Sequence, residues 1–404
     1  LGSNNVDCRI HPRDAAQSEA QRIALGGIGG HGSIEALGRA KTIFLVGSDP
    51  FRENPILALQ VRKAHRAGAV IVSVNPRRVD LRLHGRLHHL NLLQGEMARA
   101  LRALAKNLAG EGVFPEGEGA EAYRTALEGE EIGDLLRFAG VEAEPLAEAT
   151  RGLLSAEEGG AAVLVGPAVC DEAASVEAVN LSLCIGGEII FASATPNVQG
   201  ALDMGLHPGC LPGGVPLDSA EARERCANAW GHHVGPDAGL SAEAVFGALS
   251  GGGVRAAYLF GCDPVAEHPD GDRVRKALEA AEFAVLHASH ANASMEYADA
   301  VLPAVTLYES EGTVTNLERR VQRLRRALPP AVEGGPKEDW KIFCDIAAEL
   351  ESPMKAHSLE RIRLEARSLA GDYAAAFGRL PEEGLRLSRP AHGQSTSPPT
   401  ARRG

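Results

Sequence analysis

Short apolar runs that end in glycine or proline alternate with longer amphipathic stretches over most of the chain. The clearest runs are residues 43–46 and 70–74, and the stretch between them has the pattern of a helix that begins at Pro55 and ends at Gly68. A strand, a helix and a second strand in this order form one right-handed βαβ unit of a parallel sheet. The pattern therefore predicts a protein of the α/β class.

Similar elements continue toward the C-terminus, beyond an acidic stretch at 110–160 that is rich in alanine and glutamate and has helical character. Further strands are predicted at 161–165, 188–191, 254–260 and 283–287, and further helices at 95–109, 171–184, 241–249, 272–281 and 337–350. Residues 192–239 are punctuated by glycine and proline, which is typical of a long loop that packs onto a domain or serves a site.

Two of the predicted strands are followed by the same turn motif. Residues 43–50 read IFLVGSDP and residues 257–264 read AYLFGCDP, so each strand ends in a glycine turn followed by aspartate, proline and a helix. A ligand of such a fold lies at the carboxyl ends of the strands. We predict two doubly wound, Rossmann-like halves with parallel sheets at 1–160 and 161–350, a helical extension at 351–387 and a disordered polar tail at 388–404.

Charge narrows the range of partners. The chain has 41 lysines and arginines against 53 aspartates and glutamates, a net charge of −12. This balance argues against a nucleic acid or an anionic lipid surface as partner, and no apolar run reaches the roughly 18 residues of a membrane helix. We expect neither nucleic-acid binding nor direct membrane insertion. Leu1 in place of an initiator methionine indicates that the chain begins within a longer reading frame.

Metal-binding patterns are absent from the sequence. The seven cysteines form no CxxC or CxxxC pair, which excludes a zinc knuckle or an iron–sulfur run and indicates isolated thiols in a reducing compartment. The histidine pairs lack the carboxylate or cysteine neighbours of a metal site. Residues 27–32 match GxGxxG, but no strand precedes them, so we expect residues 1–32 to be irregular and this run to be a flexible linker.

The stretch at 297–322, YADAVLPAVTLYESEGTVTNLERRVQ, resembles the late signature of the molybdopterin oxidoreductase superfamily. Within that superfamily the chain is most similar to the peripheral-arm subunit of bacterial NADH-quinone oxidoreductase (respiratory complex I) that has this domain. The segments SNNVDCRIHPRD at 3–14 and NVQGALDMGLHPGCLPGG at 197–214 match the same family. The resemblance covers roughly residues 1–350 and implies the fold of formate dehydrogenase domains 1–3.

The resemblance also implies where a cofactor would lie. Molybdenum-using relatives place a Cys, selenocysteine or Ser metal ligand at a position that falls near Arg13 here, whereas Cys8 stands too early, and their turn Asn is replaced by Asp49 and Asp263. We therefore assign no catalytic residue and no metal ligand, and we expect molybdopterin to be absent. The vestigial cleft would be formed by Gly47, Asp49, Asn75, Arg77, Gly166, Gly261, Asp263, Asn316 and Arg320.

Each of these features has a structural alternative. Asp49 and Asp263 could each cap the helix that follows, and the loop at 197–214 could be an ordered structural loop rather than the lining of a cofactor cleft. The basic run could approach a pterin nucleotide, or it could be a solvated strand face or a contact with an acidic neighbouring subunit. This run comprises Arg319, Arg320, Arg323, Arg325 and Arg326.

The resemblance leads to one functional expectation and one rival from another class. We expect a scaffold without its own metal cofactor, which contacts other peripheral-arm subunits of complex I on the cytoplasmic side of the bacterial inner membrane. Iron–sulfur clusters would belong to an N-terminal portion of the intact subunit. The rival is the catalytic large subunit of a molybdopterin-dependent oxidoreductase similar to formate dehydrogenase, whose metal ligand would lie upstream of residue 1 or be a displaced Cys8. Metal analysis distinguishes the two. A stand-alone nucleotide-binding protein would need a strand before Gly27.

Overall fold

The structure is a computed structural model that describes residues 3–29, 32–115, 119–155, 160–193, 195–330, 332 and 335–388. The tail expected to be disordered lies outside the described residues from 389 onward, as do Gly30 and His31 of the glycine-rich run. The chain divides into two compact units. Residues 13–196 and 317–319 form the five-stranded unit, and residues 3–12, 197–316 and 320–388 form the three-stranded unit.

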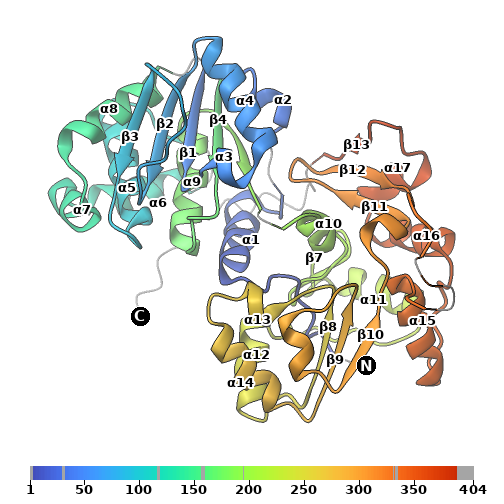
Figure 1. Cartoon of the computed structure of the whole chain (residues 1–404). Helices are drawn as coiled ribbons and strands as arrows, with labels where there is room; N and C mark the ends of the chain where they lie inside the picture. Colours follow the sequence, from blue (N-terminus) through green and yellow to red (C-terminus); the bar gives the residue numbers. More distant parts are fainter. Residues whose placement is uncertain are drawn as a thin grey trace. The chain divides into compact units, whose positions relative to one another are not determined.

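The five-stranded unit holds a parallel sheet in the order β3-β2-β1-β4-β5 (Figure 1). Its strands are β1 Thr42–Val46, β2 Val70–Asn75, β3 Leu87–Asn91, β4 Ala161–Val165 and β5 Glu188–Phe191. Its helices are α1 Pro12–Leu25, α2 Ile34–Leu37, α3 Pro50–Glu53, α4 Pro55–Arg66, α5 Met97–Gly110, α6 Ala120–Glu128, α7 Ile132–Ala139, α8 Ala143–Leu154 and α9 Glu172–Cys184. Every residue of β1 and β4 is buried, because helices cover both faces of the sheet.

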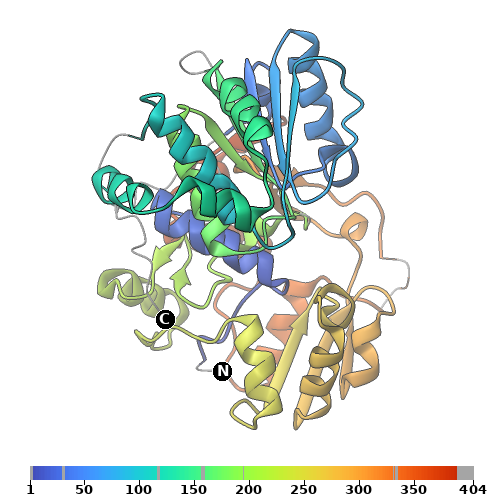
Figure 2. The ribbon, with the colours of Figure 1, turned by 90° about the vertical axis from the view of Figure 1, so that its left-hand side faces the viewer.

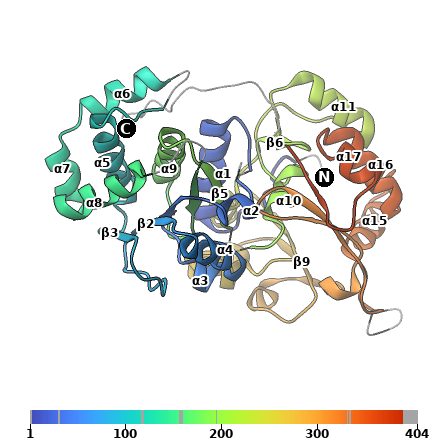
Figure 3. The same ribbon diagram turned by 90° about the horizontal axis from the view of Figure 1, so that it is seen from above.

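Two apolar clusters fill the space on either side of this sheet. Phe44 and Val72 face the larger cluster, which α5 to α9 complete, and Ile43 and Ile71 face a smaller one under α2 and α4. Figure 2 shows the blue helix α4 on one side of the sheet and the teal helices on the other, and Figure 3 gives the view from above. Alternate side chains of one strand therefore serve two cores, as the continuous apolar runs predicted.

The three-stranded unit is built around a parallel sheet in the order β10-β9-β8. Its strands are β8 Ala256–Phe260, β9 Phe283–Ala288 and β10 Ala300–Pro303, with helices α12 Ala242–Ser250, α13 Pro264–Glu267, α14 Gly271–Glu279, η1 Ala293–Tyr297 and α15 Asp339–Glu349. α12 and α14 bury one apolar face of the sheet. On the other face, the Phe343 ring of α15 packs against Tyr258 and Phe260, with centroids 5.7 and 5.1 Å apart.

A second, antiparallel sheet in this unit joins the C-terminal segment to the signature stretch. It consists of β11 Gly312–Thr315, β12 Arg320–Leu324 and β13 Leu385–Arg386. The remaining elements are α10 Val198–Asp203, β6 Cys210–Leu211, β7 Val215–Pro216, α11 Ala220–Trp230, η2 Leu307–Glu309, α16 Leu359–Leu369 and α17 Tyr373–Gly378. The extension expected at 351–387 is thus helical but also contributes a strand, and Tyr373 is buried in its core.

The prediction of an α/β fold with parallel sheets is confirmed. The division expected at residue 160 differs from the one that the structure shows. β4 was expected to open a second half, but it pairs with β1 along its whole length, from Thr42↔Ala161 to Val46↔Val165. The helices α5 to α8 return the chain to the free edge of β1, so residues 161–196 complete the first sheet. No helix in the described part of the chain is long and apolar enough to cross a membrane.

The expectation that residues 1–32 are irregular is wrong for residues 12–25, which form α1. The sequence hides this helix because most of its buried residues are polar, namely Gln17, Ser18 and Gln21, so no apolar stripe marks the buried face. Gln17 donates to the carbonyl oxygens of Gly166 (3.1 Å) and Val169 (3.0 Å), and Gln21 accepts from the Gly29 N–H (2.8 Å). Side-chain amides that find backbone partners can replace apolar contacts in a buried position.

Candidate functional site

The polar residues of the five-stranded unit gather at the carboxyl ends of β1, β2 and β4. The strand order reverses between β1 and β4, which is where ligands of doubly wound sheets bind. Gly47 follows β1 with φ +57°, and the Gly166 N–H after β4 donates to Val46 O at 2.8 Å. A Cβ on Gly166 would lie 2.4 Å from Ser48 Cα, so two backbones meet here and only glycine fits.

Asp49 lies within this edge with 4% of its surface exposed. The alternative that it caps its own helix is wrong, because its side chain makes no capping hydrogen bond to the described residues of α3. Its carboxylate instead lies 3.5 Å from Arg52 Nε and 3.6 Å from an Arg77 terminal nitrogen. Asn75 accepts from the Arg77 N–H at 3.3 Å. Five predicted site residues are therefore brought to one edge: Gly47, Asp49, Asn75, Arg77 and Gly166.

The same turn recurs after β8 in the three-stranded unit. Gly261 has φ +59°, and Asp263 has φ −126° and ψ 74°, against −118° and 75° for Asp49. In both turns the aspartate N–H donates to a glutamate four residues on, Asp49 to Glu53 (2.8 Å) and Asp263 to Glu267 (3.2 Å). The two turns predicted from sequence to be alike therefore share their backbone angles. They also share a glutamate carboxylate that accepts a hydrogen bond from the aspartate N–H.

For Asp263 too, the alternative of capping its own helix is wrong, because its side chain makes no capping hydrogen bond to the described residues of α13. Its carboxylate accepts from the Ala293 N–H (3.0 Å), the Ser294 N–H (3.0 Å) and the Ser294 hydroxyl (2.6 Å). These are the first amides of η1, so Asp263 caps a neighbouring helical turn instead. Both carboxylate oxygens of Asp263 accept hydrogen bonds from its own unit, so we assign Asp263 a structural role.

Replacing Asp263 should destabilise the protein much more than replacing Asp49. Asp263→Ala is expected to lower the free energy of unfolding by about 1.5–3 kcal/mol, the cost of losing hydrogen bonds to a charged acceptor. Asp49→Ala is expected to lower the free energy of unfolding by no more than about 1 kcal/mol. Its arginine partners are exposed to solvent, and their nitrogens lie 3.5 and 3.6 Å away, too far for strong hydrogen bonds. Urea unfolding of both variants measures the difference, and equal losses would contradict the assigned roles.

Two polar atoms between β1 and α4 have no partner among the described residues. Ser48 is fully buried, and neither its Oγ nor the Oδ1 of Asn54 forms a hydrogen bond there. Buried polar atoms are nearly always paired, so an orphan indicates a missing ligand or water. Sequence reasoning missed both residues because serine and asparagine are ordinary in turns. Glu53 and Glu267 were also missed, although their shared place six residues after the turn glycine was a usable signal.

The charge of this edge is mixed. Burial raises the pKa of Glu53, the hydrogen bond from the Asp49 N–H opposes that rise, and the negative charge of Asp49 adds to it. A phosphate at the turn amide would have to displace Glu53, whereas a hydrogen-bonding nucleoside or pterin ring could use Ser48 and Asn54. The edge therefore fits the organic part of a nucleotide-like cofactor better than its phosphates.

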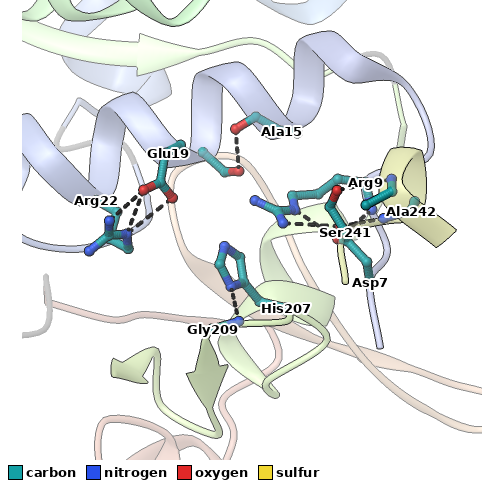
Figure 4. Close-up of polar contacts among 11 residues, drawn as sticks. Asp7, Arg9, Ala15, Glu19, Arg22, His207, Gly209, Ser241 and Ala242 are labelled. Atoms are coloured by element: carbon teal, nitrogen blue, oxygen red, sulfur yellow. Dashed lines mark hydrogen bonds and ion pairs between the residues drawn. The ribbon is translucent and has the colours of Figure 1, made fainter. Parts of the chain in front are cut away.

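The Asn-Asn-x-Asp motif near the N-terminus has a structural role. Asn4 donates to Asp237 O at 2.8 Å, and Asp7 accepts from the Ala242 N–H at 3.1 Å, so the motif holds the start of α12. Figure 4 shows Asp7 in its paired contact with Arg9, a buried residue whose Nε lies 2.7 Å from Asp7 Oδ1. The same view shows His207, whose Nδ1 accepts from the Gly209 N–H at 3.0 Å.

A cationic side chain stands near the position where the resemblance implies a metal ligand. Arg13 lies in the first turn of α1 with its Nε 3.2 Å from Asp14 Oδ1. A guanidinium cannot take the place of a thiolate ligand, and no group of three or more metal-binding side chains occurs within the described ranges. Arg13 itself therefore does not fit the role of a thiolate ligand.

The glycine-rich loop at 197–214 is tied to the signature stretch and to the C-terminal helices. Asn197, at φ +60°, accepts from the Thr315 N–H at 2.8 Å. The Tyr373 hydroxyl donates to the Asp203 carboxylate at 2.8 Å. These contacts are those of an ordered structural loop.

The arginine run and Asn316 belong to the β11–β12 hairpin, in a different sheet from Gly261. Asn316 accepts from the Arg320 N–H at 2.9 Å and closes the hairpin turn. Three of the arginines pair with carboxylates of the same unit: Arg323 with Glu311 (3.6 Å), Arg325 with Glu382 (3.2 Å) and Arg326 with Glu338 (2.8 Å). For these three arginines the pairs match the alternative of a solvated strand face, whereas Arg319 is buried, with 2% of its surface exposed.

Comparison with known proteins identifies the family to which this chain is similar. The family model described as molybdopterin oxidoreductase matches residues 1–349. Formate dehydrogenase H of Escherichia coli K12 is 29% identical over 405 residues, which cover 95% of this chain and 56% of that protein. The NADPH-Fe(3+) oxidoreductase subunit alpha of Geobacter sulfurreducens is 29% identical over 395 residues, 93% of this chain and 45% of that protein. Acetylene hydratase from Pelobacter acetylenicus shares the fold, with a TM-score of 0.70 at 13% identity over 98% of this chain and 59% of that one.

These relatives bear on two expectations. They are formate dehydrogenases and similar oxidoreductases, and none of these is named as a subunit of NADH-quinone oxidoreductase, so they favour the rival over the scaffold. The expectation that molybdopterin is absent loses support, since the family is described by that cofactor. The chain spans about half the length of these relatives. On the match over residues 1–349, the chain belongs to the molybdopterin oxidoreductase family.

Proposed function

We propose that this chain is the cofactor-binding part of a molybdopterin-dependent oxidoreductase of the formate dehydrogenase type. The observation that carries the proposal is the similarity to formate dehydrogenase H over 95% of this chain. The edge of β1, β2 and β4 supports it, because two buried polar atoms there lack partners within the described part of the chain. When bound, the cofactor supplies the two-electron redox chemistry of the reaction.

The residues of this chain would bind and orient the cofactor. Gly47 lets a ligand approach the backbone, and the Ser48 hydroxyl and the Asn54 side-chain oxygen offer hydrogen bonds. Arg77, with 59% of its side chain exposed, brings a positive charge beside Asp49 and could donate hydrogen bonds to the organic part of the cofactor. The metal would need a ligand other than Arg13, either upstream of residue 1 or a displaced Cys8, because a guanidinium cannot supply one.

A second candidate rests on Arg13 itself. A cation at the metal position favours a domain that keeps the fold without the metal, such as a scaffold subunit of an NADH-quinone oxidoreductase. Its partners would then be peripheral-arm subunits with iron–sulfur clusters, on the cytoplasmic side of the membrane. Metal and pterin analysis of the same preparation separates the two candidates.

The test uses a pair of arginine variants of the full-length protein. Pterin is released by acid oxidation and measured by fluorescence in the wild type, in Arg77→Ala and in Arg39→Ala. Arg39 is a matched control, because it also pairs with an acidic residue, Glu35, and is 66% exposed. We expect Arg77→Ala to retain roughly tenfold less pterin, the effect of about 1.4 kcal/mol, and Arg39→Ala to retain as much as the wild type. Equal retention in all three would overturn the assigned role of Arg77.

A further inference from the structure

The connection from β2 to β3 contains no helix. Every other connection between successive strands of the five-stranded sheet contains at least one, whereas residues 76–86 form neither helix nor strand. Apolar and charged positions alternate at 78–83, which is typical of an extended segment, and Val79 and Leu81 are buried in the smaller core cluster. An extended segment is thinner than a helix, which is about 10–12 Å wide with its side chains, so it covers less of the sheet.

A pocket of about 300 Å³ is lined by this connection and by the edge strand β3. Four of the lining side chains are aliphatic: Val79, Leu81, Leu83 and Leu87. The others are polar and include Arg78 and His89. The volume is at the lower end of small-molecule sites. The pocket therefore suits a small ligand that has both a polar group and an apolar part.

The polar part of the lining is cationic. In a chain with a net charge of −12, residues 76–86 hold four arginines against one aspartate. Arg82 lies 4.0 Å from Asp80, whereas Arg78 is exposed and forms no ion pair with the described residues. Burial lowers the pKa of His89, and the positive charge of Arg78 lowers it further. One unpaired positive charge fits a monoanion, and the carboxylate of Asp80 opposes a dianion.

A buried hydroxyl beside the pocket has no partner in the described part of the chain. Ser73 of β2 is 1% exposed, and its Oγ forms no hydrogen bond there. Ser73 pairs with His89 in the parallel register, so both side chains project from the same face of the sheet. Buried hydroxyls are nearly always paired. An acceptor group bound beside His89 would give this hydroxyl a partner.

We propose that this pocket binds a small aliphatic monocarboxylate at a site separate from the cofactor edge. The planar guanidinium of Arg78 donates two parallel hydrogen bonds to the carboxylate, and the aliphatic lining surrounds the alkyl chain. A phosphate fits less well, because its second negative charge meets Asp80. The pocket includes none of the five predicted residues at the cofactor edge, so the inference is independent of the proposed cofactor function.

The experiment follows valine and leucine methyl signals of the full 404-residue chain by NMR, with hexanoate as the probe. We expect saturable shifts at the four aliphatic lining residues and no shift at Leu104, which lies in the core cluster on the other side of the sheet. Butyrate should bind roughly fifteenfold more weakly, because each buried CH₂ contributes about a factor of four. Hexanol should bind about tenfold more weakly than hexanoate, because it has no charge to pair with the guanidinium.

Two arginine variants test the assigned contact. Arg78→Ala is expected to weaken hexanoate binding about tenfold, the cost of losing hydrogen bonds between charged groups. Arg151→Ala is the matched control, because Arg151 is also exposed but belongs to α8, which packs on the opposite face of the sheet. This control should bind hexanoate as the wild type does. Both variants should keep the methyl spectrum and the pterin content of the wild type.

Five results would overturn the proposal. In two of them, hexanoate causes no saturable shift at the lining residues, or Arg78→Ala binds it as tightly as the wild type. Hexanol that binds as tightly as hexanoate would show an apolar pocket without preference for an anion. Tighter binding of hexylphosphonate would assign the pocket to a dianion. Loss of pterin in Arg78→Ala alone would assign the pocket to the cofactor, whereas hexanoate binding by a protein without pterin would contradict only the proposed function.

Discussion

Replacing Arg102 with methionine is expected to lower the free energy of unfolding by about 3–5 kcal/mol at pH 8, the cost of leaving a buried charge without its partner. Arg102 lies 2.7 Å from the Glu177 carboxylate, whose side chain is 6% exposed, and 2.9 Å from Glu130. The Tyr123 hydroxyl also donates to Glu177. Arg102→Met removes the only full positive charge that these contacts bring to Glu177.

The loss should depend on pH. Burial raises the pKa of Glu177, and the charge of Arg102 opposes that rise. Without Arg102 the folded-state pKa rises further above the unfolded value of about 4.3. The folded state then binds more protons than the unfolded state between the two pKa values, so the free energy of unfolding falls as pH rises through that window. The variant should therefore be closer to the wild type at pH 5 than at pH 8.

Urea unfolding at both pH values measures this effect, with Arg137→Met as the control. Arg137 pairs with Asp134 in α7, but both side chains are more than 60% exposed, so its loss should cost no more than about 0.5 kcal/mol at either pH. A pH-independent loss in Arg102→Met, or a loss as small as that of the control, would show that the buried pair does not hold Glu177 in place.

Gly166→Ala is expected to cost about 3 kcal/mol or more, at the upper end of what overpacking usually costs. The added Cβ would lie 2.4 Å from Ser48 Cα and 2.5 Å from Gly47 O. Both are backbone atoms of the turn after β1, so no side-chain rotation can relieve the contact. The two loops must separate, which would also disturb the proposed cofactor edge.

Gly133→Ala is the matched control for this substitution. Gly133 lies in α7, and a Cβ there would meet no atom of the described chain within 4 Å outside its own helix backbone and its neighbours. The change should leave stability unchanged or raise it by up to about 1 kcal/mol, because alanine favours a helix more than glycine does. Thermal and urea unfolding of the two variants give the comparison. A Gly166→Ala protein as stable as the wild type would show that the β1 and β4 turns are not in contact.

Much of the first sheet could be predicted from sequence because its strands are buried on both faces. The runs at 43–46 and 70–74 are apolar at every position or nearly so, and only a parallel sheet covered by helices accommodates such strands. The repeat of the Gly-x-Asp-Pro turn was also visible, and the structure extends it to the backbone angles of Asp49 and Asp263. These features are local, and local patterns are what a single sequence records.

The elements that could not be predicted depend on distant partners. The sequence did not predict α1, because its buried Gln17 forms its hydrogen bonds with residues about 150 positions away in the sequence. The division at 160 was misplaced because the pairing of β4 with β1 leaves no mark in either strand. The sequence could not show which helical turn Asp263 caps, because the residues that donate to its carboxylate, Ala293 and Ser294, lie 30 residues or more further on.

The candidate site shows the same limit. Gly47, Asp49, Asn75, Arg77 and Gly166 were found from turn chemistry and family resemblance, and they share one edge. Ser48 and Asn54 were not found, since an unpaired buried atom is a property of the packed structure. Asn316 and Arg320 were included through resemblance alone, and the structure places them in a hairpin of another sheet.

The most direct test of the proposed function is the pterin and metal content of the purified full-length protein. Fluorescence of the oxidised pterin and mass spectrometry for molybdenum and tungsten can be applied to one preparation. The proposal predicts pterin in stoichiometric amount, with a metal held by a ligand other than Arg13. A protein with neither pterin nor metal would contradict it, and would leave the metal-free scaffold, with Arg13 in the place of the ligand, as the better description.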